Sequence, residues 1–262
     1  MNGPHPGGSP GTARHDDPPP AGIPFRRLLA VETRKLFDTR GSMLMTALLV
    51  VMTVVFVAGR GTVAGPRLHM LTGTAGIGYG TLLPVLGILT VTGEWAHRTA
   101  LVTFALEPRR VRVLAAKCVP PLVLAVVASL FAALAGVAAT AVTARLQGVP
   151  AVWDLPPLAL LGWTAGNVLV VATGLAMGML LTNAPAAIVI CLSVPMLGSL
   201  VARLGGVGEV LAGWLDLGTT SAPLAAGTMT GGEAARLAVS VLLWIVAPTA
   251  VGMARAARRD IA

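Results

Sequence analysis

Charge is what this sequence has least of. Only 11% of its 262 residues are Asp, Glu, Lys or Arg, whereas a soluble domain usually carries about a quarter. Aromatic residues are also few, at 4%, so the 55% hydrophobic fraction is mostly Ala, Val and Leu. The mean hydropathy is +0.80. Together these values exclude an ordinary soluble domain and predict an all-α integral membrane protein.

Groupings of residues that would perform chemistry are also missing. The two cysteines, Cys118 and Cys191, lie within or at the edge of apolar runs, so we expect no disulfide. The four histidines are scattered and form no HExxH motif or cluster with carboxylates. Neither lysine follows a glycine, which excludes a P-loop for ATP. We therefore expect no catalytic residue, no metal and no cofactor in this chain.

Long runs without charge are what the sequence does contain. A helix needs roughly 20 apolar residues to cross a bilayer. Five runs qualify, and the fourth, 155–202, would extend about 72 Å as one helix, at about 1.5 Å per residue. It must therefore fold back, and Thr182-Asn183-Ala184-Pro185 is the natural turn. Six spans result, at about 41–59, 70–93, 118–144, 155–182, 184–202 and 237–254.

The segments outside these spans have distinct compositions. Residues 1–24 are rich in Pro and Gly, so we expect a disordered tail. Residues 25–40 predict an amphipathic helix at the membrane interface, with an i,i+4 pair between Arg34 and Asp38. Its apolar face consists of Phe25, Leu28, Leu29 and Leu36, and its basic face of Arg26, Arg27, Arg34 and Lys35. Within 203–236, the apolar face from Val207 to Leu215 predicts a short re-entrant or interfacial helix.

The basic residues indicate the orientation of the chain. If the N-terminus is cytoplasmic, fourteen of the nineteen Lys and Arg residues lie on the cytoplasmic side. Six spans then place the C-terminus on that side as well. The domain organisation is thus a tail (1–24), an interfacial helix (25–40) and a membrane domain (41–262). The net charge of +8 follows from this topology, so we do not expect nucleic-acid binding.

The predicted spans contain small residues but no ionisable ones. The lack of Asp, Glu, Lys, Arg and His argues against a proton- or sodium-coupled carrier. Glycines recur at multiples of four, which favours close helix packing, either within the chain or at a dimer seam. They are Gly76 and Gly80 in the second span and Gly162, Gly166, Gly174 and Gly178 in the fourth. Asn167 is expected to bond a neighbouring helix, with substrate contact as the alternative.

The string GIGYG (76–80) has a superficial likeness to a potassium-channel filter. It lies inside an uninterrupted apolar run and has no hydroxyl at its first position. Filters are built from irregular backbone, so we interpret these glycines as packing residues.

The segment 93–117 concentrates the polarity of the middle of the chain. Glu94 and Arg98 are placed for an i,i+4 pair, and Pro108 ends the helical pattern. Arg109, Arg110 and Arg112 then lead back toward the membrane. The segment is either a loop whose arginines anchor the topology or a surface on which a partner docks.

The order of residues in this segment resembles that of ABC-2 type transporter permeases after their second span. The resemblance rests on Glu94, His97-Arg98-Thr99, Pro108-Arg109-Arg110 and Ala115-Ala116-Lys117. The stretch 31–43 (VETRKLFDTRGSM) is similar to the start of the first span in the same family, with Glu32, Lys35 and Arg40 matching.

The resemblance implies a half-transporter in a bacterial plasma membrane. Two permease subunits would associate, each would bind a separate ABC ATPase subunit, and the complex would export a small molecule or lipid. The residues implied in ATPase docking and coupling are Glu32, Lys35, Glu94, His97, Arg98, Thr99, Glu107, Pro108, Arg109 and Arg110. Three alternatives stay open: a non-transporting anchor or regulatory subunit, an ion channel, and a membrane enzyme, for which no paired catalytic groups are visible.

Overall fold

The computed structural model describes residue 3 and residues 24–96 and 110–258. The predicted tail therefore lies almost wholly outside the described residues. Within them the chain is helical and has no strand, apart from an isolated parallel bridge between Arg67 and Val152. The all-α prediction is confirmed.

Within residues 24–96 and within 110–258, the helices follow one another with short connections. They are α1 (Phe25–Asp38), α2 (Arg40–Val63), α3 (Leu68–Thr74), α4 (Gly76–Ala96), α6 (Arg110–Gln147), α7 (Pro157–Leu181), α8 (Ala184–Ala202), α9 (Val207–Leu215), α10 (Leu217–Ala226), α11 (Gly231–Val241), the π-helix η1 (Leu242–Val246) and α12 (Ala247–Arg258).

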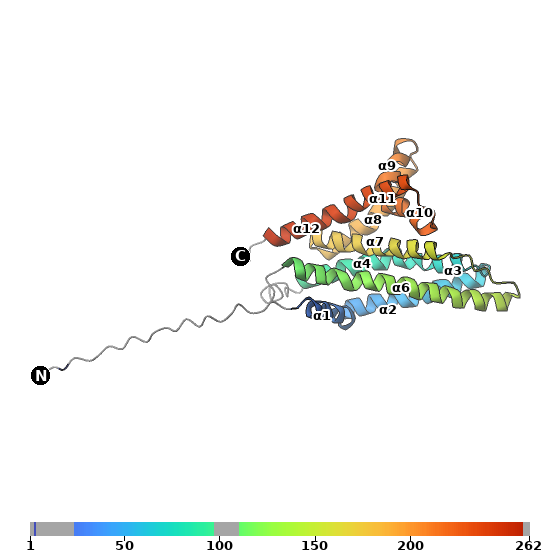
Figure 1. Cartoon of the computed structure of the whole chain (residues 1–262), viewed down its shortest axis with the longest axis horizontal. Coiled ribbons are helices and arrows are strands. Elements are labelled where there is room, and N and C mark those ends of the chain that lie inside the picture. Colours follow the sequence, from blue (N-terminus) through green and yellow to red (C-terminus); the bar gives the residue numbers. More distant parts are fainter. Residues whose placement is uncertain (1–2, 4–23, 97–109, 259–262) are drawn as a thin grey trace.

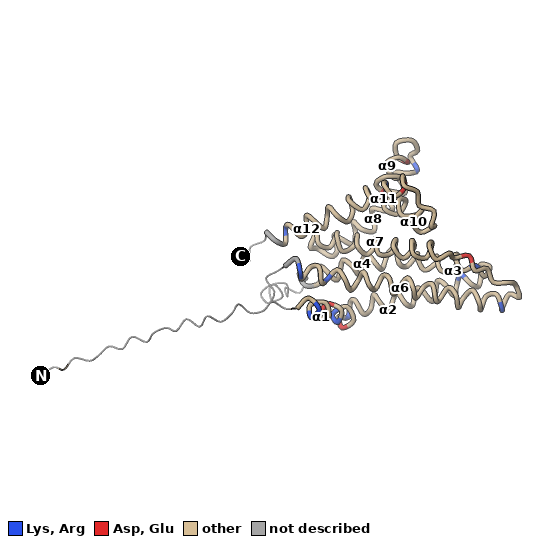
Figure 2. The backbone as a smooth tube through the Cα atoms, in the orientation of Figure 1, with Lys and Arg blue, Asp and Glu red and all other residues tan. Residues whose placement is uncertain are grey.

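Six helical segments in the described ranges are long and apolar enough to cross a membrane. They are Arg40–Val63, Leu68–Gly93, Arg112–Gln147, Pro157–Leu181, Ala184–Ala202 and Gly231–Ala256. Each overlaps one span predicted from the sequence. Charged residues gather toward the ends of the helices and leave the middle of the bundle bare (Figure 2). The chain is thus a multi-pass membrane protein.

Three of these segments differ from the predicted spans. The second is divided at Ala75, where α3 ends before α4 begins. The third belongs to α6, which has 38 residues and so extends about 57 Å, well beyond about 30 Å of hydrocarbon. The last begins at Gly231 rather than near 237, because Thr230 and Glu233 form a capping box. The length of a charge-free run therefore underestimates the length of a helix whose ends carry polar residues.

The turn between the fourth and fifth spans lies where the sequence places it. Thr182 adopts a left-handed conformation (φ 49°) and ends α7. The Asn183 side chain then accepts a hydrogen bond from Ala186 N and caps α8.

Helices α4, α6 and α7 form the middle of the bundle, with α1 and α2 on one side and α8 to α12 on the other (Figure 1). Helix α1, the end of α12 and the start of α6 share one end, which we call the α1 end (Figure 1). Helices α4 and α7 run in the same direction and nearly touch. A Cβ on Gly174 would overlap the Pro84 carbonyl oxygen, and one on Gly178 would lie 3.3 Å from Ile88 Cα.

The glycine stripe of α7 has more than one role. Gly162 also packs tightly, because a Cβ there would overlap the Leu224 carbonyl oxygen of α10. A Cβ on Gly76 would make only an ordinary contact, 3.8 Å from Trp163 Nε1. At Gly80 and Gly166 an added Cβ would meet nothing within 4 Å. The packing prediction is wrong for these last two, because α4 and α7 leave a cavity beside them.

Tyr79, the only tyrosine of the chain, joins four helices. Its hydroxyl donates to Ala128 O of α6 (2.7 Å) and accepts from Thr53 Oγ1 of α2 (3.1 Å). Its ring stacks on Trp163 of α7, with centroids 5.8 Å apart. The string GIGYG forms the first turn of α4 and is regular helix, unlike the irregular backbone of a filter.

A second polar contact joins α6 and α7. Asn167 Nδ2 donates to Ser129 Oγ (2.9 Å), and both residues are buried. The predicted bond between Asn167 and a neighbouring helix is confirmed.

The segment between α8 and the last span is a pair of helices rather than one. Helix α9 ends at Leu215, and Asp216 caps α10 by accepting a hydrogen bond from Thr219 N (2.8 Å). Ser240 Oγ of α11 donates to Trp214 O (2.8 Å), which fastens the pair to the last span.

The glycines of α7 yield a matched test of packing. Gly174→Ala should lower the free energy of unfolding by about 1–3 kcal/mol, because its methyl group would displace the backbone of α4. Gly166→Ala adds the same methyl group to the same helix in open space and should leave stability unchanged or slightly raised. Thermal unfolding in detergent measures both. Equal losses would contradict the close approach of α4 and α7.

Candidate functional site

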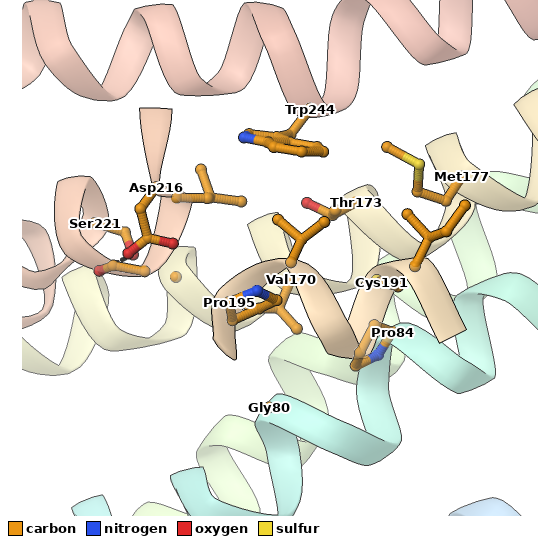
Figure 3. A pocket seen from close by; sticks show the side chains of 15 residues that line it. Gly80, Pro84, Val170, Thr173, Met177, Cys191, Pro195, Asp216, Ser221 and Trp244 are labelled. Atoms are coloured by element: carbon orange, nitrogen blue, oxygen red, sulfur yellow. Dashed lines mark hydrogen bonds between the residues drawn. The ribbon is translucent and has the colours of Figure 1, made fainter. Parts of the chain in front are cut away.

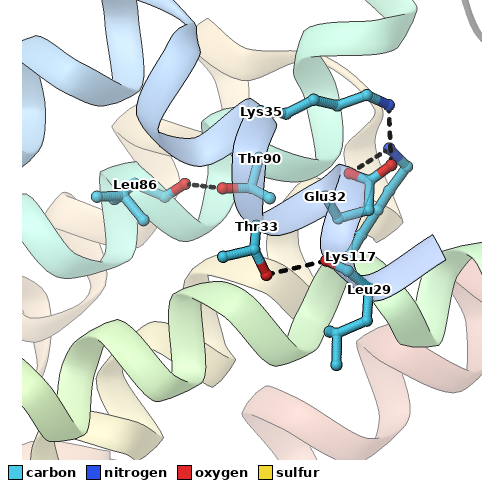
Figure 4. A network of polar contacts seen from close by, with 7 residues as sticks. All are labelled: Leu29, Glu32, Thr33, Lys35, Leu86, Thr90 and Lys117. Carbon is cyan, nitrogen blue, oxygen red and sulfur yellow. Dashed lines mark hydrogen bonds and ion pairs between the residues drawn. The ribbon is translucent and has the colours of Figure 1, made fainter. Parts of the chain in front are cut away.

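A buried acid holds α1 against α6. Glu32 lies one turn before Leu36 on the inner face of α1, and both are buried. Glu32 Oε2 accepts from Lys117 Nζ of α6 at 3.0 Å, and Oε1 accepts from Lys35 Nζ at 2.8 Å (Figure 4). Both carboxylate oxygens are therefore engaged by ammonium groups.

Because Glu32 and Lys117 are both buried, their contact must compensate for the loss of hydration of two charged groups. Their side chains are only 6% and 3% exposed. An ion pair removed from water needs good geometry to offset its desolvation, and removal of one partner leaves an unbalanced charge. The pair is better suited to fix the register of α1 on α6 than to add stability.

An exposed pair on the same helix provides the contrast. Arg34 Nε lies 2.9 Å from Asp38 Oδ2, as the spacing predicts, but both side chains are more than half exposed. Such surface pairs contribute about 0–1 kcal/mol. The buried pair between Glu32 and Lys117 therefore fixes the helix, and the exposed pair between Arg34 and Asp38 does not.

The outer surface of α1 combines aromatic and basic residues. Leu36 is buried and Leu28 and Leu29 are half-buried, as the predicted apolar face requires, but Phe25 is exposed. Phe25, the first residue of α1, lines a shallow groove together with exposed Phe37, Arg26 and Arg34. The predicted apolar face is thus buried at Leu36 and half-buried at Leu28 and Leu29, but it is exposed at Phe25, where α1 begins.

Only four of the ten residues predicted to dock an ATPase lie among the described residues. Glu32 and Lys35 belong to the buried network. Glu94 lies in the last turn of α4 and Arg110 begins α6. The others, His97, Arg98, Thr99, Glu107, Pro108 and Arg109, lie outside the described residues.

Lys117 is the member of the network whose role the sequence did not reveal. In the sequence it stands just before the third predicted span and 85 residues from Glu32, and it enters only as part of the family resemblance. A lone acid on the inner face of an otherwise basic helix was the available signal, since such an acid requires a cationic partner.

A cavity of about 260 Å³ lies in the other half of the bundle, between α4, α7, α8, α10 and η1 (Figure 3). Gly80 and Gly166 leave it open on the side of α4 and α7. Its other lining residues are Pro84, Val170, Thr173, Met177, Ile190, Cys191, Val194, Pro195, Asp216, Leu217, Gly218, Ser221 and Trp244.

Irregular helix geometry converges on this cavity. Pro84 and Pro195 each interrupt the hydrogen bonding of a spanning helix, and Trp244 lies in the π-helix. Single π-turns inside α-helices are frequent at functional sites. The sequence alone did not predict this cavity, although its two prolines and its stripe of glycines are the signals that could have indicated it.

Comparison with known proteins identifies no relative. No protein-family model matches the chain, and no curated protein matches it. Among the described residues, no group of three or more His, Cys, Asp or Glu side chains could hold a metal ion.

The buried pair can be tested against the exposed one. Glu32→Ala should lower the free energy of unfolding by about 3–5 kcal/mol, because it removes the carboxylate that neutralises a buried ammonium. Asp38→Ala removes an acid from the same helix and should cost less than about 1 kcal/mol. Thermal unfolding in detergent measures both. Similar small losses would show that α1 is not held by the pair.

Proposed function

We propose that the chain is the membrane-spanning subunit of an ABC-2 type transporter in a bacterial plasma membrane. A separate ATPase subunit supplies the energy, and a second permease subunit completes the complex. The observation that carries the proposal is the contact between Glu32 and Lys117. It joins α1 to the first turns of α6, the helix that follows residues 97–109 in the sequence.

The distribution of charge supports the same proposal. Basic residues of α1, the start of α6 and the end of α12 gather at the α1 end (Figure 2). We assign this end to the cytoplasm by the excess of Lys and Arg. A charged surface suits a partner that must bind specifically and reversibly.

The proposed mechanism transmits force through packed helices. Movement of the ATPase pair would displace α1 and residues 97–109, and the buried pair would pass the movement to α6. Tyr79 and Asn167 connect α6 to α4 and α7, which line the cavity. ATP drives such a change only if its binding differs in affinity between the two states of the complex.

The orientation can be tested by labelling. In a chain whose Cys118 and Cys191 are replaced by Ala, Arg109→Cys should react with a membrane-impermeant maleimide only after the cells are opened. Arg145→Cys, near the other end of α6, should react in intact cells. Labelling of Arg109→Cys from outside would overturn the topology and with it the ATPase-docking role.

Coupling can be tested in the complex purified with its ATPase. The double substitution Glu94→Ala/Arg98→Ala should leave membrane insertion intact and reduce ATPase activity stimulated by the permease on the order of tenfold, a usual size for coupling between sites. Arg203→Ala/Glu209→Ala removes an exposed pair of opposite charges far from the α1 end and is the matched control.

The outcomes separate the proposal from its rivals. Undiminished stimulation in the Glu94/Arg98 variant would reject docking at this segment. An ATPase complex without substrate movement would indicate a regulatory subunit. Ion conduction by the purified chain in a planar bilayer, without nucleotide, would indicate a channel.

A further inference from the structure

The cavity lined by Asp216 and Trp244 is polar at one end only. Asp216 is the one charged residue among the described residues that line it, and Ser221 lies beside it (Figure 3). Met177 and Cys191 lie at the opposite end (Figure 3). The lining is otherwise apolar except for Thr173. Asp216 lies between α9 and α10, outside the six apolar segments, and is half-buried, so its carboxylate is a charged group at the edge of an otherwise apolar space.

Only half of the Asp216 carboxylate is engaged by the protein. Oδ2 accepts from Thr219 N (2.8 Å) and Thr219 Oγ1 (2.6 Å), which caps α10. Across the described part of the chain, Oδ1 accepts no hydrogen bond from a protein group. The capping contacts therefore occupy Oδ2, and Oδ1 can interact with a bound ligand.

Trp244 lines the same cavity and is fastened to the residue before Asp216. Its indole Nε1 donates to Leu215 O at 2.6 Å, one residue before Asp216. The ring spans the side of the cavity opposite Val170 and Pro195 (Figure 3). An aromatic face close to a carboxylate is the combination that binds ammonium groups, through cation–π attraction and charge.

We infer that this cavity binds an organic cation with an apolar body, such as an alkylammonium. Its head group lies between Asp216 and Trp244, and its chain extends toward Met177 and Cys191. The volume of about 260 Å³ suits a compact ligand. That this cation is the transported compound rests on the proposed function, whereas its binding does not.

Binding can be measured on the full chain in phosphatidylcholine nanodiscs without an ATPase. Calorimetry should show octyltrimethylammonium binding above the signal of empty nanodiscs, and more tightly than neutral 1-octanol. Asp216→Asn keeps an N-cap residue and removes the charge. It should weaken binding of the cation at least about tenfold and leave octanol unchanged. Glu209→Gln removes an exposed acid outside the cavity and should change neither.

A second variant tests the location without changing charge. Gly166→Leu would project into the open space of the cavity and should weaken both ligands. Equal affinity of Asp216→Asn and the unaltered chain for the cation, or no effect of Gly166→Leu, would overturn the inference. The two proposals can also fail separately. If the variants change cation binding as expected but the chain stimulates no ATPase, the cation site is supported and the proposed transporter function is rejected.

Discussion

The close approach of α4 and α7 determines the shape of this bundle. Inside a membrane, helices gain little from the hydrophobic effect and associate through close packing and hydrogen bonds. Gly174 lets its helix reach the backbone at Pro84, and Gly178 continues the contact along Ile88. The other helices arrange themselves around this pair. Tyr79 reaches from α4 to α2 and α6, and Asn167 reaches from α7 to α6.

The ion pair between Glu32 and Lys117 attaches a peripheral helix to this core in a different way. Close packing fixes distance but tolerates sliding, whereas a buried carboxylate between two ammonium groups specifies one register. Helix α1 therefore moves with α6 or loses the pair. This constraint makes α1 suitable to transmit force, which is the role that we propose for it.

The sequence predicts the helices better than it predicts their contacts. The charge-free runs located six spanning helices, and Asn183-Ala184-Pro185 located the turn after α7. Spacing could not separate Gly174, which touches backbone, from Gly166, which borders open space. Both lie in one stripe, and the difference depends on which part of a neighbouring helix faces each glycine. The partner of Glu32 could not be predicted either, because two residues that are 85 positions apart in the sequence form no local pattern.

The cavity lies between two contacts that α7 makes with the second half of the chain. Toward the start of α7, Gly162 touches the backbone of Leu224 in α10. Toward its end, Gly252 of α12 packs on Met179, and Arg255 donates to Leu180 O. A change at either contact would alter the space between them without breaking the α4–α7 core. The contact at Met179 and Leu180 is near the α1 end, where the proposed ATPase docks. A shift of α12 there would reach Trp244 along one continuous run of helix, which connects the proposed docking surface to the cation site.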